Sequence, residues 1–218
     1  MATKLPKVSL EDRIPRQIKT PLSLRKRCDF WESQGWKYSA KVECHSYAEY
    51  LAAGILEIDP NVRHYTPQPL RFRVGSTWYV PDFWFQDYKG REFLWELKPN
   101  AEFNEAWREA LSQYCQDLFI DFHVMANEAF TSQEQRALNA WWLIRWRNQY
   151  SEWPTHALES KDYLSLLGEG SRFGEGMWES YQRKDIPLLT SYLDGLLSGK
   201  LRCEWNNPIG WNTRLGLA

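Results

Sequence analysis

The sequence is poor in cysteine and has no apolar run long enough to cross a membrane. Its four cysteines form no CxxC pair and no other spacing typical of a metal site; they are Cys28, Cys44, Cys115 and Cys203. The longest apolar run, ALNAWWLIRW at 137–146, is too short for a bilayer and contains Arg145. The first residues, MATKLPKVSLEDR, lack the apolar stretch of a secretory signal. We therefore expect a reduced, cytoplasmic protein with unpaired thiols and no membrane segment.

The sequence also lacks a strong net charge, but its charges are unevenly distributed. The formal net charge is −1, whereas residues 1–41 hold ten basic and four acidic side chains. A basic segment before a mildly acidic body is found in nucleic-acid-binding proteins. It is equally typical of a solvated, partly unstructured terminus, and both interpretations stay open.

We expect residues 1–41 to be a basic N-terminal arm with little regular structure before about Phe30. Its basic side chains would bind DNA phosphates without reading bases, so affinity would fall steeply with salt. The first candidates for DNA binding are Arg25, Lys26 and Arg27, followed by Lys37 and Lys41. Weaker candidates, on the polar face of a later strand, are Arg71 and Arg73.

The periodicity of residues 42–130 predicts a compact α/β domain. An apolar period of 3.6 residues over 44–58 predicts a helix, which Asp59-Pro60 would end. Alternating apolar residues and intervening turn residues predict strands at 70–74, 77–85 and 91–97. A second amphipathic helix is expected at 101–118, and a further strand at 119–125. The order helix, antiparallel strands, helix, strand is typical of one α/β unit.

From Thr131 onward the pattern becomes helical, and residues 131–218 are interpreted as a separate module. Thr131 and Glu134 are spaced as a capping box that would open a helix through about Asn148. This helix is apolar on most sides from 137 to 146, so it is expected to be buried or to bind a partner. Further expected elements are helices at 161–167 and 187–198, a loop at 168–176 and a hairpin within 201–215. We predict a small helical or winged-helix-like module that binds partners.

Three charged side chains interrupt the apolar pattern of the two central strands. Asp82 follows Pro81 at the start of an aromatic strand. Glu96 and Lys98 close the next strand, in the run YVPDFWFQDYKGREFLWELKP. Residues two apart in a strand point to the same side, so Glu96 and Lys98 share a face. One hairpin separates them from Asp82, and we expect the three groups to converge at one edge of the sheet.

This set of groups suits the hydrolysis of a phosphodiester. Mg²⁺ takes oxygen ligands and keeps several waters, so Asp82, Glu96 and the backbone carbonyl of Leu97 would suffice to hold it, and Mn²⁺ is expected to substitute. The cation would lower the pKa of a bound water and neutralise charge on the phosphate. Lys98 would orient that water or stabilise the transition state. Glu49, on the helix before the sheet, is the candidate for a third carboxylate ligand.

Each of these residues also has a purely structural explanation. Glu96 and Lys98 are spaced as an exposed ion pair, and Asp82 after a proline is a common turn residue. Glu49 completes an S-x-x-E capping box, and Glu57 on the same helix is a rival for the third carboxylate. For any one residue the structural explanation is the simpler one. Taken together, the P-D strand, the 13-residue gap and the E-x-K strand match the PD-(D/E)xK pattern of metal-dependent nucleases.

The run from 42 to 99 resembles the catalytic domain of the TnsA family, the endonuclease subunits of heteromeric DNA transposases. The matching features are the helix with Ser46 and Glu49, TPQP at 66–69, YVPDF at 79–83 and LWELKP at 94–99. Family members vary at the position of Glu96, and an acid there favours full metal ligation. By position, the resemblance implies a catalytic set of Glu49, Asp82, Glu96 and Lys98.

The resemblance also implies a restriction-endonuclease-like fold and a Mg²⁺-dependent DNA endonuclease that cuts the 5′ ends of a mobile element, the strands that are not transferred. A DDE-type, TnsB-like transposase would cut and join the 3′ ends, and an AAA+, TnsC-like regulator would link both to target choice. The complex would act in the bacterial cytoplasm, at the nucleoid when assembled. Two alternatives stay open: a stand-alone restriction or repair nuclease of the same fold, and an inactive DNA-binding or assembly module.

Overall fold

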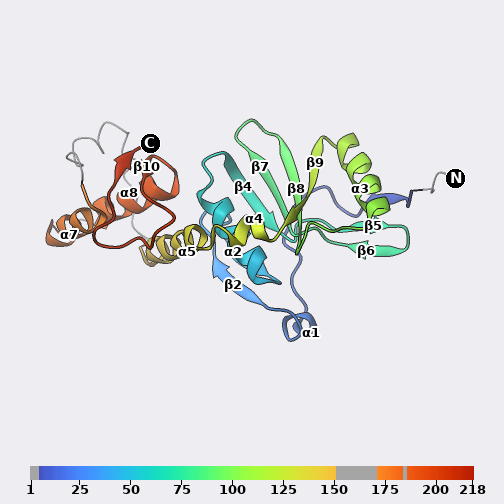
Figure 1. Ribbon diagram of the computed structural model, residues 1–218, viewed down its shortest axis with the longest axis horizontal. Coiled ribbons are helices and arrows are strands. Elements are labelled where there is room, and N and C mark those ends of the chain that lie inside the picture. The colour runs from blue at the N-terminus through green and yellow to red at the C-terminus, as the bar shows by residue number, and fades with distance from the viewer. Residues whose placement is uncertain (1–4, 151–170, 184–185) are drawn as a thin grey trace.

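A four-stranded mixed sheet forms the centre of the protein (Figure 1). The computed structural model describes residues 5–150, 171–183 and 186–218. The strands lie in the order β4 (Val62–Pro67), β7 (Phe83–Asp87), β8 (Glu92–Lys98) and β9 (Ile120–Ala126). β7 is antiparallel to both its neighbours, whereas β9 runs parallel to β8 because helix α3 (Glu105–Asp117) makes the crossover. The α/β class predicted from the sequence is confirmed.

Helices cover both faces of this sheet, and successive residues of β7 enter different cores. Phe83 and Phe85 pack in a cluster with Leu51 of α2 (Tyr47–Ile58). Trp84, between them in the sequence, packs with Leu111 of α3 in a second cluster. The alternation of side chains along β7 thus supplies both cores.

A second sheet has the order β1 (Val8–Leu10), β5 (Phe72–Val74) and β6 (Thr77–Tyr79). The predicted hairpin between β5 and β6 is confirmed, and Gly75 at φ +62° begins its two-residue turn. The single strand expected at 77–85 is wrong, because β6 and β7 belong to different sheets. Pro81 lies between them and has no N–H to continue a ladder.

Residues before Phe30 are more regular than the sequence suggested. β1 pairs with β5, and a short helix α1 follows at Leu22–Arg25. Between these two elements the chain runs along the sheet domain, with Ile18 N donating to Gln68 O at 3.0 Å. The expectation of little regular structure is therefore wrong for this segment, because its backbone groups bond to distant strands. Strand β2 (Trp31–Gln34) then pairs with β3 (Lys41–Cys44), so a hairpin spans the expected boundary at residue 41.

The C-terminal part begins with α4 (Glu128–Thr131) and α5 (Glu134–Gln149). The predicted capping box is wrong: Thr131 ends α4, and Gln133 is the N-cap of α5 without a side-chain bond. Helices α7 (Phe173–Arg183) and α8 (Ile186–Leu197) and the antiparallel strands β10 (Leu201–Arg202) and β11 (Gly216–Leu217) complete the described chain. The helix at 187–198 is confirmed, and the expected loop is wrong from Phe173 onward. The helix expected at 161–167 lies outside the described residues.

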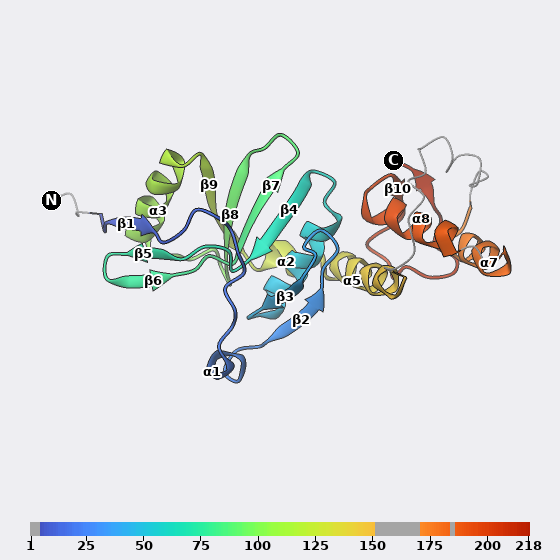
Figure 2. The same ribbon diagram turned by 180° about the vertical axis from the view of Figure 1, so that it is seen from behind.

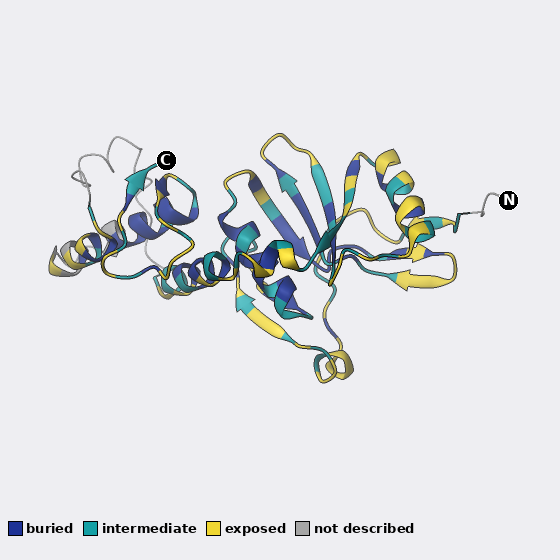
Figure 3. Ribbon diagram, viewed as in Figure 1, coloured by how far each residue is buried: buried dark blue, intermediate teal, exposed yellow. Residues whose placement is uncertain are grey.

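One apolar cluster joins the C-terminal part to the sheet domain. It includes residues of α2, α5 and α8, and buried residues of these helices are dark blue in Figure 3. Helix α5 packs closely on α2 at Gly54, where a Cβ would lie 2.8 Å from Trp141 Nε1. Of the two alternatives left open for this apolar helix, burial holds for much of its length, from Ala137 to Ile144. Seen from behind, α5 leads away from the sheet towards α8 and α7, and β1 lies at the opposite end beside β5 and β6 (Figure 2). Among the described residues, no helix combines the length and apolarity needed to cross a bilayer.

Candidate active site

The three predicted carboxylates come from three elements that are far apart in the sequence. Glu49 lies in the first turn of α2, Asp82 immediately before β7, and Glu96 near the end of β8. Asp82 is attached to β8 twice, because its N–H donates to Trp95 O at 3.1 Å and its Oδ2 accepts from Leu97 N at 2.7 Å. The N–H of Leu97 thus attaches Asp82 to β8 at the residue next to Glu96.

The electrostatics of Asp82 reflect its acidic neighbours. Burial raises the pKa of Asp82 well above its ordinary value, and the negative charges of Glu49 and Glu96 raise it further. The Leu97 N–H and the charge of Lys98 act in the opposite direction without outweighing these effects. Three acids therefore repel one another at this point, and an added cation would relieve the repulsion.

Glu96 and Lys98 form an ion pair in which Glu96 is buried and Lys98 is partly exposed. Glu96 is 3% exposed, and its Oε1 lies 2.5 Å from Lys98 Nζ. Its Oε2 accepts a hydrogen bond from Tyr79 Oη at 2.7 Å. Burial raises the pKa of Glu96, although Lys98 and Tyr79 act to lower it. Glu96 and Lys98 are therefore not a fully exposed surface ion pair, because the Glu96 carboxylate is buried.

Lys98 remains a protonated ammonium in this environment. Burial acts to lower its pKa, but the hydrogen bond and charge of Glu96 outweigh that effect, and the net pKa is raised. The charges of Asp82 and Glu49 add to the increase. A firmly protonated amine suits an electrostatic role on a phosphate better than proton abstraction from water.

Glu49 fulfils the structural prediction and also lies at the site. The capping box is present: Glu49 N donates to Ser46 Oγ at 3.2 Å, and Glu49 Oε1 accepts from the same hydroxyl at 2.9 Å. The other carboxylate oxygen accepts from His45 N at 2.8 Å and from Gln68 Nε2 at 3.0 Å. Capping therefore explains how Glu49 is held, and its charge acts on Asp82 in addition.

The rival carboxylate, Glu57, lies at the other end of α2. It is fully buried and accepts hydrogen bonds from Trp36 N at 3.0 Å, Lys37 N at 2.6 Å and Tyr65 Oη at 2.8 Å. Burial raises the pKa of Glu57, although these donors and the charge of Lys37 oppose the increase. Of the two helix glutamates, Glu49 is the one whose charge raises the pKa of Asp82.

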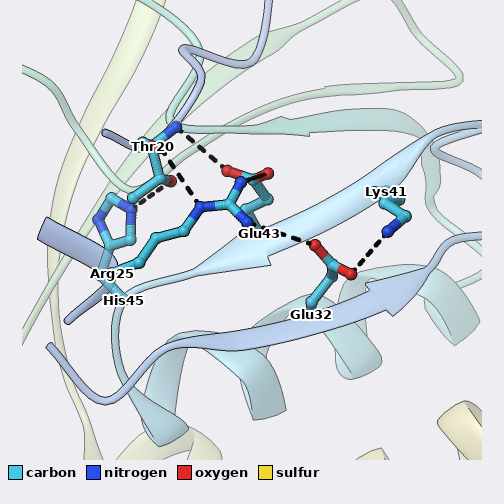
Figure 4. A network of polar contacts seen from close by, with 6 residues as sticks. All are labelled: Thr20, Arg25, Glu32, Lys41, Glu43 and His45. Carbon is cyan, nitrogen blue, oxygen red and sulfur yellow. Dashed lines mark hydrogen bonds and ion pairs between the residues drawn. The ribbon is translucent and has the colours of Figure 1, made fainter. Parts of the chain in front are cut away.

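Two of the predicted DNA-binding residues belong to a polar network between α1, β2 and β3 (Figure 4). Arg25 is hydrogen-bonded to Glu43 and donates to Thr20 O at 3.3 Å. Glu32 lies 2.7 Å from the ammonium of Lys41 and 3.8 Å from the guanidinium of Arg25. Burial acts to raise the pKa of Glu43, but hydrogen bonds from Thr20 and Arg25 outweigh it and lower the pKa. These contacts hold α1 against β3, and they occupy the charges of Arg25 and Lys41.

Lys37 is likewise occupied within the fold. Its Nζ donates to Leu56 O at 3.0 Å and to Asp59 O at 2.5 Å, at the C-terminal end of α2. Burial lowers its pKa to about 8, although the charges of Glu57 and Asp59 oppose this. A cation at the end of a helix stabilises the unpaired carbonyls there. The geometry therefore assigns Lys37 to helix capping and not to a DNA surface.

The remaining basic candidates lie at the surface. Lys26 and Arg27 are exposed at the end of α1. Arg71 and Arg73 flank the ring of Trp78, at 5.6 and 5.9 Å from its centre. Trp78 is 53% exposed and pairs with Arg73 across the β5–β6 hairpin. The sequence interpretation missed Trp78, although the alternation of the hairpin places it on the same face as the two arginines.

Two further residues touch the carboxylates without having been predicted. Tyr79 follows Trp78 on the opposite face of β6 and donates to Glu96. Burial raises the pKa of Tyr79 well above its ordinary value, and the charge of Glu96 adds to this, so the phenol stays a donor. Gln68 donates to Glu49 through its side chain and to Asp82 O through its backbone N–H at 2.8 Å. The TPQP run was the one available signal for Gln68.

The chemistry of these donors fits a hard divalent cation. The carboxylates of Glu49, Asp82 and Glu96 offer oxygen ligands and an excess of negative charge. The amide oxygen of Gln68 is buried and has no hydrogen-bond partner among the described residues. In the same part of the chain, no three His, Cys, Asp or Glu side chains are already arranged as a metal centre. The carboxylates instead accept bonds from protein donors, and a cation would have to replace some of these.

No protein-family model matches the chain, and a search of curated proteins finds no similar sequence.

Proposed function

We propose that this protein is a Mg²⁺-dependent DNA endonuclease of the PD-(D/E)xK type. The observation that carries the proposal is the convergence of Glu49, Asp82 and Glu96, from three separate elements, with Lys98 paired to Glu96. The mutual repulsion of the acids supports a role for them beyond the structural one, because a fold gains no stability from like charges placed together.

The topology around the site supports a restriction-endonuclease-like core. Helix α2 precedes the antiparallel strands β4, β7 and β8, and the crossover helix α3 leads to the parallel strand β9. This is the predicted order of helix, mixed sheet, helix and strand. The β5–β6 hairpin is inserted between β4 and β7, and its Tyr79 holds Glu96 in place.

The proposed roles follow from the contacts of each side chain. Asp82, Glu96 and the carbonyl of Leu97 would hold Mg²⁺, with Glu49 as the further carboxylate. When bound, the cation supplies an activated water and neutralises phosphate charge. Lys98 carries its positive charge beside Glu96 and stabilises the negative charge that develops on the phosphate oxygens.

We further propose that the chain acts as a TnsA-like subunit of a heteromeric transposase. It would cleave the 5′ ends of the mobile element in double-stranded DNA, beside a DDE-type transposase and an AAA+ regulator, in the bacterial cytoplasm. The YVPDF and LWELKP runs support this, since they carry Asp82, Glu96 and Lys98. We propose the C-terminal part, from α5 onward, as the surface for these partners.

The test separates cation binding from cleavage. Calorimetry with Mn²⁺ and Mg²⁺ should show binding by the wild type and none by Asp82→Ala or Glu96→Ala. Asp87→Asn is the control, because Asp87 is an acid at the other end of β7, where it is paired with Arg91. Absence of binding by the wild type would overturn the proposal.

Cleavage then distinguishes a transposase subunit from a stand-alone nuclease. Plasmid DNA is incubated with Mg²⁺ and the protein, alone and together with a DDE-type transposase and an AAA+ ATPase encoded by neighbouring genes. Cutting at element ends only in the mixture supports the subunit. Sequence-specific cutting by the protein alone supports the stand-alone nuclease.

A further inference from the structure

Gln68 has a backbone conformation that few residues other than glycine adopt. Its φ is +38°, and it lies between Pro67 and Pro69, with only 4% of its surface exposed. A non-glycine residue keeps such a conformation only where its surroundings determine it strongly, and these positions cluster at functional sites. The contacts of Gln68 show which surroundings are involved.

The backbone of Gln68 is attached to the segment of Asp82. Gln68 N donates to Asp82 O at 2.8 Å, and Gln68 O accepts from Ile18 N at 3.0 Å. The residue is therefore fixed relative to the start of β7 on one side and to the N-terminal segment on the other.

The side chain of Gln68 points to a different carboxylate. Its Nε2 donates to Glu49 Oε2 at 3.0 Å, which also settles the orientation of the amide, since the reverse would place two acceptors together. The amide oxygen is then buried without a hydrogen-bond partner among the described residues. A buried acceptor without a donor is costly, and beside the Glu49 carboxylate its natural partner is a cation or a water bound to one.

We propose that Gln68 is a positioning residue of the cation site, which ties Glu49 to Asp82 and adds a neutral oxygen donor. This inference rests on the proposed function. An amide serves both tasks, because its N–H₂ group holds the Glu49 carboxylate and its oxygen adds no further negative charge. A glutamate at this position would lose the donor and increase the repulsion among the acids.

The experiment measures Mn²⁺ affinity by calorimetry on the DNA-free protein. Gln68→Met removes both polar groups at similar size. Gln86→Met makes the same change in β7, where the Gln86 side chain donates to Gly90 O in the following turn. Gln68→Met should weaken Mn²⁺ binding about 10- to 100-fold, the usual effect of losing a residue that orients metal ligands. Gln86→Met should bind Mn²⁺ like the wild type.

A second variant controls for loss of stability in Gln68→Met. Gln68→Gly removes the same side chain, favours the left-handed backbone and keeps both backbone hydrogen bonds. It should weaken Mn²⁺ binding as strongly as Gln68→Met while its cation-free melting temperature stays at or above that of the wild type. A role in stability alone would lower the melting temperature and leave the Mn²⁺ affinity unchanged.

The outcomes separate this inference from the proposed function. Wild-type Mn²⁺ affinity in both Gln68 variants, with binding abolished in Asp82→Ala, would overturn the role of Gln68 and leave the cation site standing. An equal loss in Gln86→Met would also overturn it. No Mn²⁺ binding by the wild type would overturn both proposals.

Discussion

The two buried glutamates of helix α2 are chemically identical and lie two turns apart, yet their surroundings differ. Glu57 accepts hydrogen bonds from two backbone N–H groups and a tyrosine hydroxyl, and the positive charge of Lys37 acts on it. Glu49 also accepts hydrogen bonds, from His45, Ser46 and Gln68, but Asp82 and Glu96 add negative charge near it. The charge of Lys98 acts on Glu49 as well, but Lys98 is paired with Glu96, so the three acids share this counter-charge.

This difference distinguishes Glu57, whose contacts join parts of the fold, from Glu49, for which we propose a role in the cation site, more clearly than burial does. The donors of Glu57 come from the turn after β2 and from β4, so its carboxylate joins parts of the fold. Burial raises the pKa of Asp82, and the charges of Glu49 and Glu96 raise it further. The comparison predicts that changes near Glu49 impair function at little cost in stability, and that changes at Glu57 do the reverse.

The largest effect is expected for Asp82→Ala. Cleavage should fall by at least about a thousandfold, because the central ligand of the cation is lost. The free energy of unfolding should not decrease much, since the carboxyl is held beside two other acids. Gel assays of DNA cleavage and urea denaturation measure the two quantities. Cleavage at the wild-type rate by a folded Asp82→Ala protein would remove the site from the reaction.

The second prediction compares the two glutamates directly by their effect on stability. Glu57→Ala leaves three buried donors without a partner, so the free energy of unfolding should fall by about 2–4 kcal/mol. Glu49→Ala also leaves donors unpaired, but it removes the repulsion with Asp82 and Glu96, so its net cost should be smaller, about 1 kcal/mol. Denaturant titration checks both values. Equal losses of stability would contradict the division of α2 into a structural and a functional end.

The same comparison shows what the sequence could predict. Asp82, Glu96 and Lys98 were predictable because strand alternation and Pro81 fix their placement locally. Glu49 and Glu57 could not be separated, because both lie on one amphipathic helix and differ only in what distant segments bring to them. The contacts that decide between them come from Gln68 and Lys37.

The parts of the fold that were mispredicted depend on pairing at long range. β1 was expected to be irregular, and it is a strand because β5, far along the chain, supplies its partner. The break between β6 and β7 likewise follows from their membership of different sheets, which alternation within the segment cannot reveal. The capping box at Thr131 failed because α4 ends there.

The third prediction uses pH to examine the Glu57 end of α2. The pKa of Lys37 is lowered from 10.5 to about 8 in the folded protein. Between these values the unfolded chain binds a proton that the folded protein does not, so stability from this group rises with pH across that window. The rise is at most roughly 3 kcal/mol, at about 1.4 kcal/mol per pKa unit.

Lys37→Met should flatten this rise, and Lys41→Met, on the same hairpin, is the control. The unfolding free energy is measured from pH 7 to about 10.5, and the difference between variant and wild-type curves isolates Lys37 from other titrating groups. Identical slopes for Lys37→Met and the wild type would show that the ammonium is not desolvated at the helix end.

The smallest effect concerns the basic side chains, to which the same distinction applies. Lys41 has its charge occupied by Glu32, whereas Arg71 and Arg73 flank the exposed ring of Trp78. Arg71 also forms an ion pair with Glu11 at 3.6 Å, longer than the 2.7 Å between Lys41 and Glu32. If the hairpin contacts phosphates, the Arg71→Ala/Arg73→Ala double variant should reduce the slope of log affinity against log salt by about 2. Lys41→Ala should leave the slope unchanged. Each lost phosphate contact releases about one fewer counterion, which is why the slope changes. Fluorescence anisotropy with duplex DNA at several salt concentrations measures the slope. An unchanged slope in the double variant would exclude the hairpin from DNA contact.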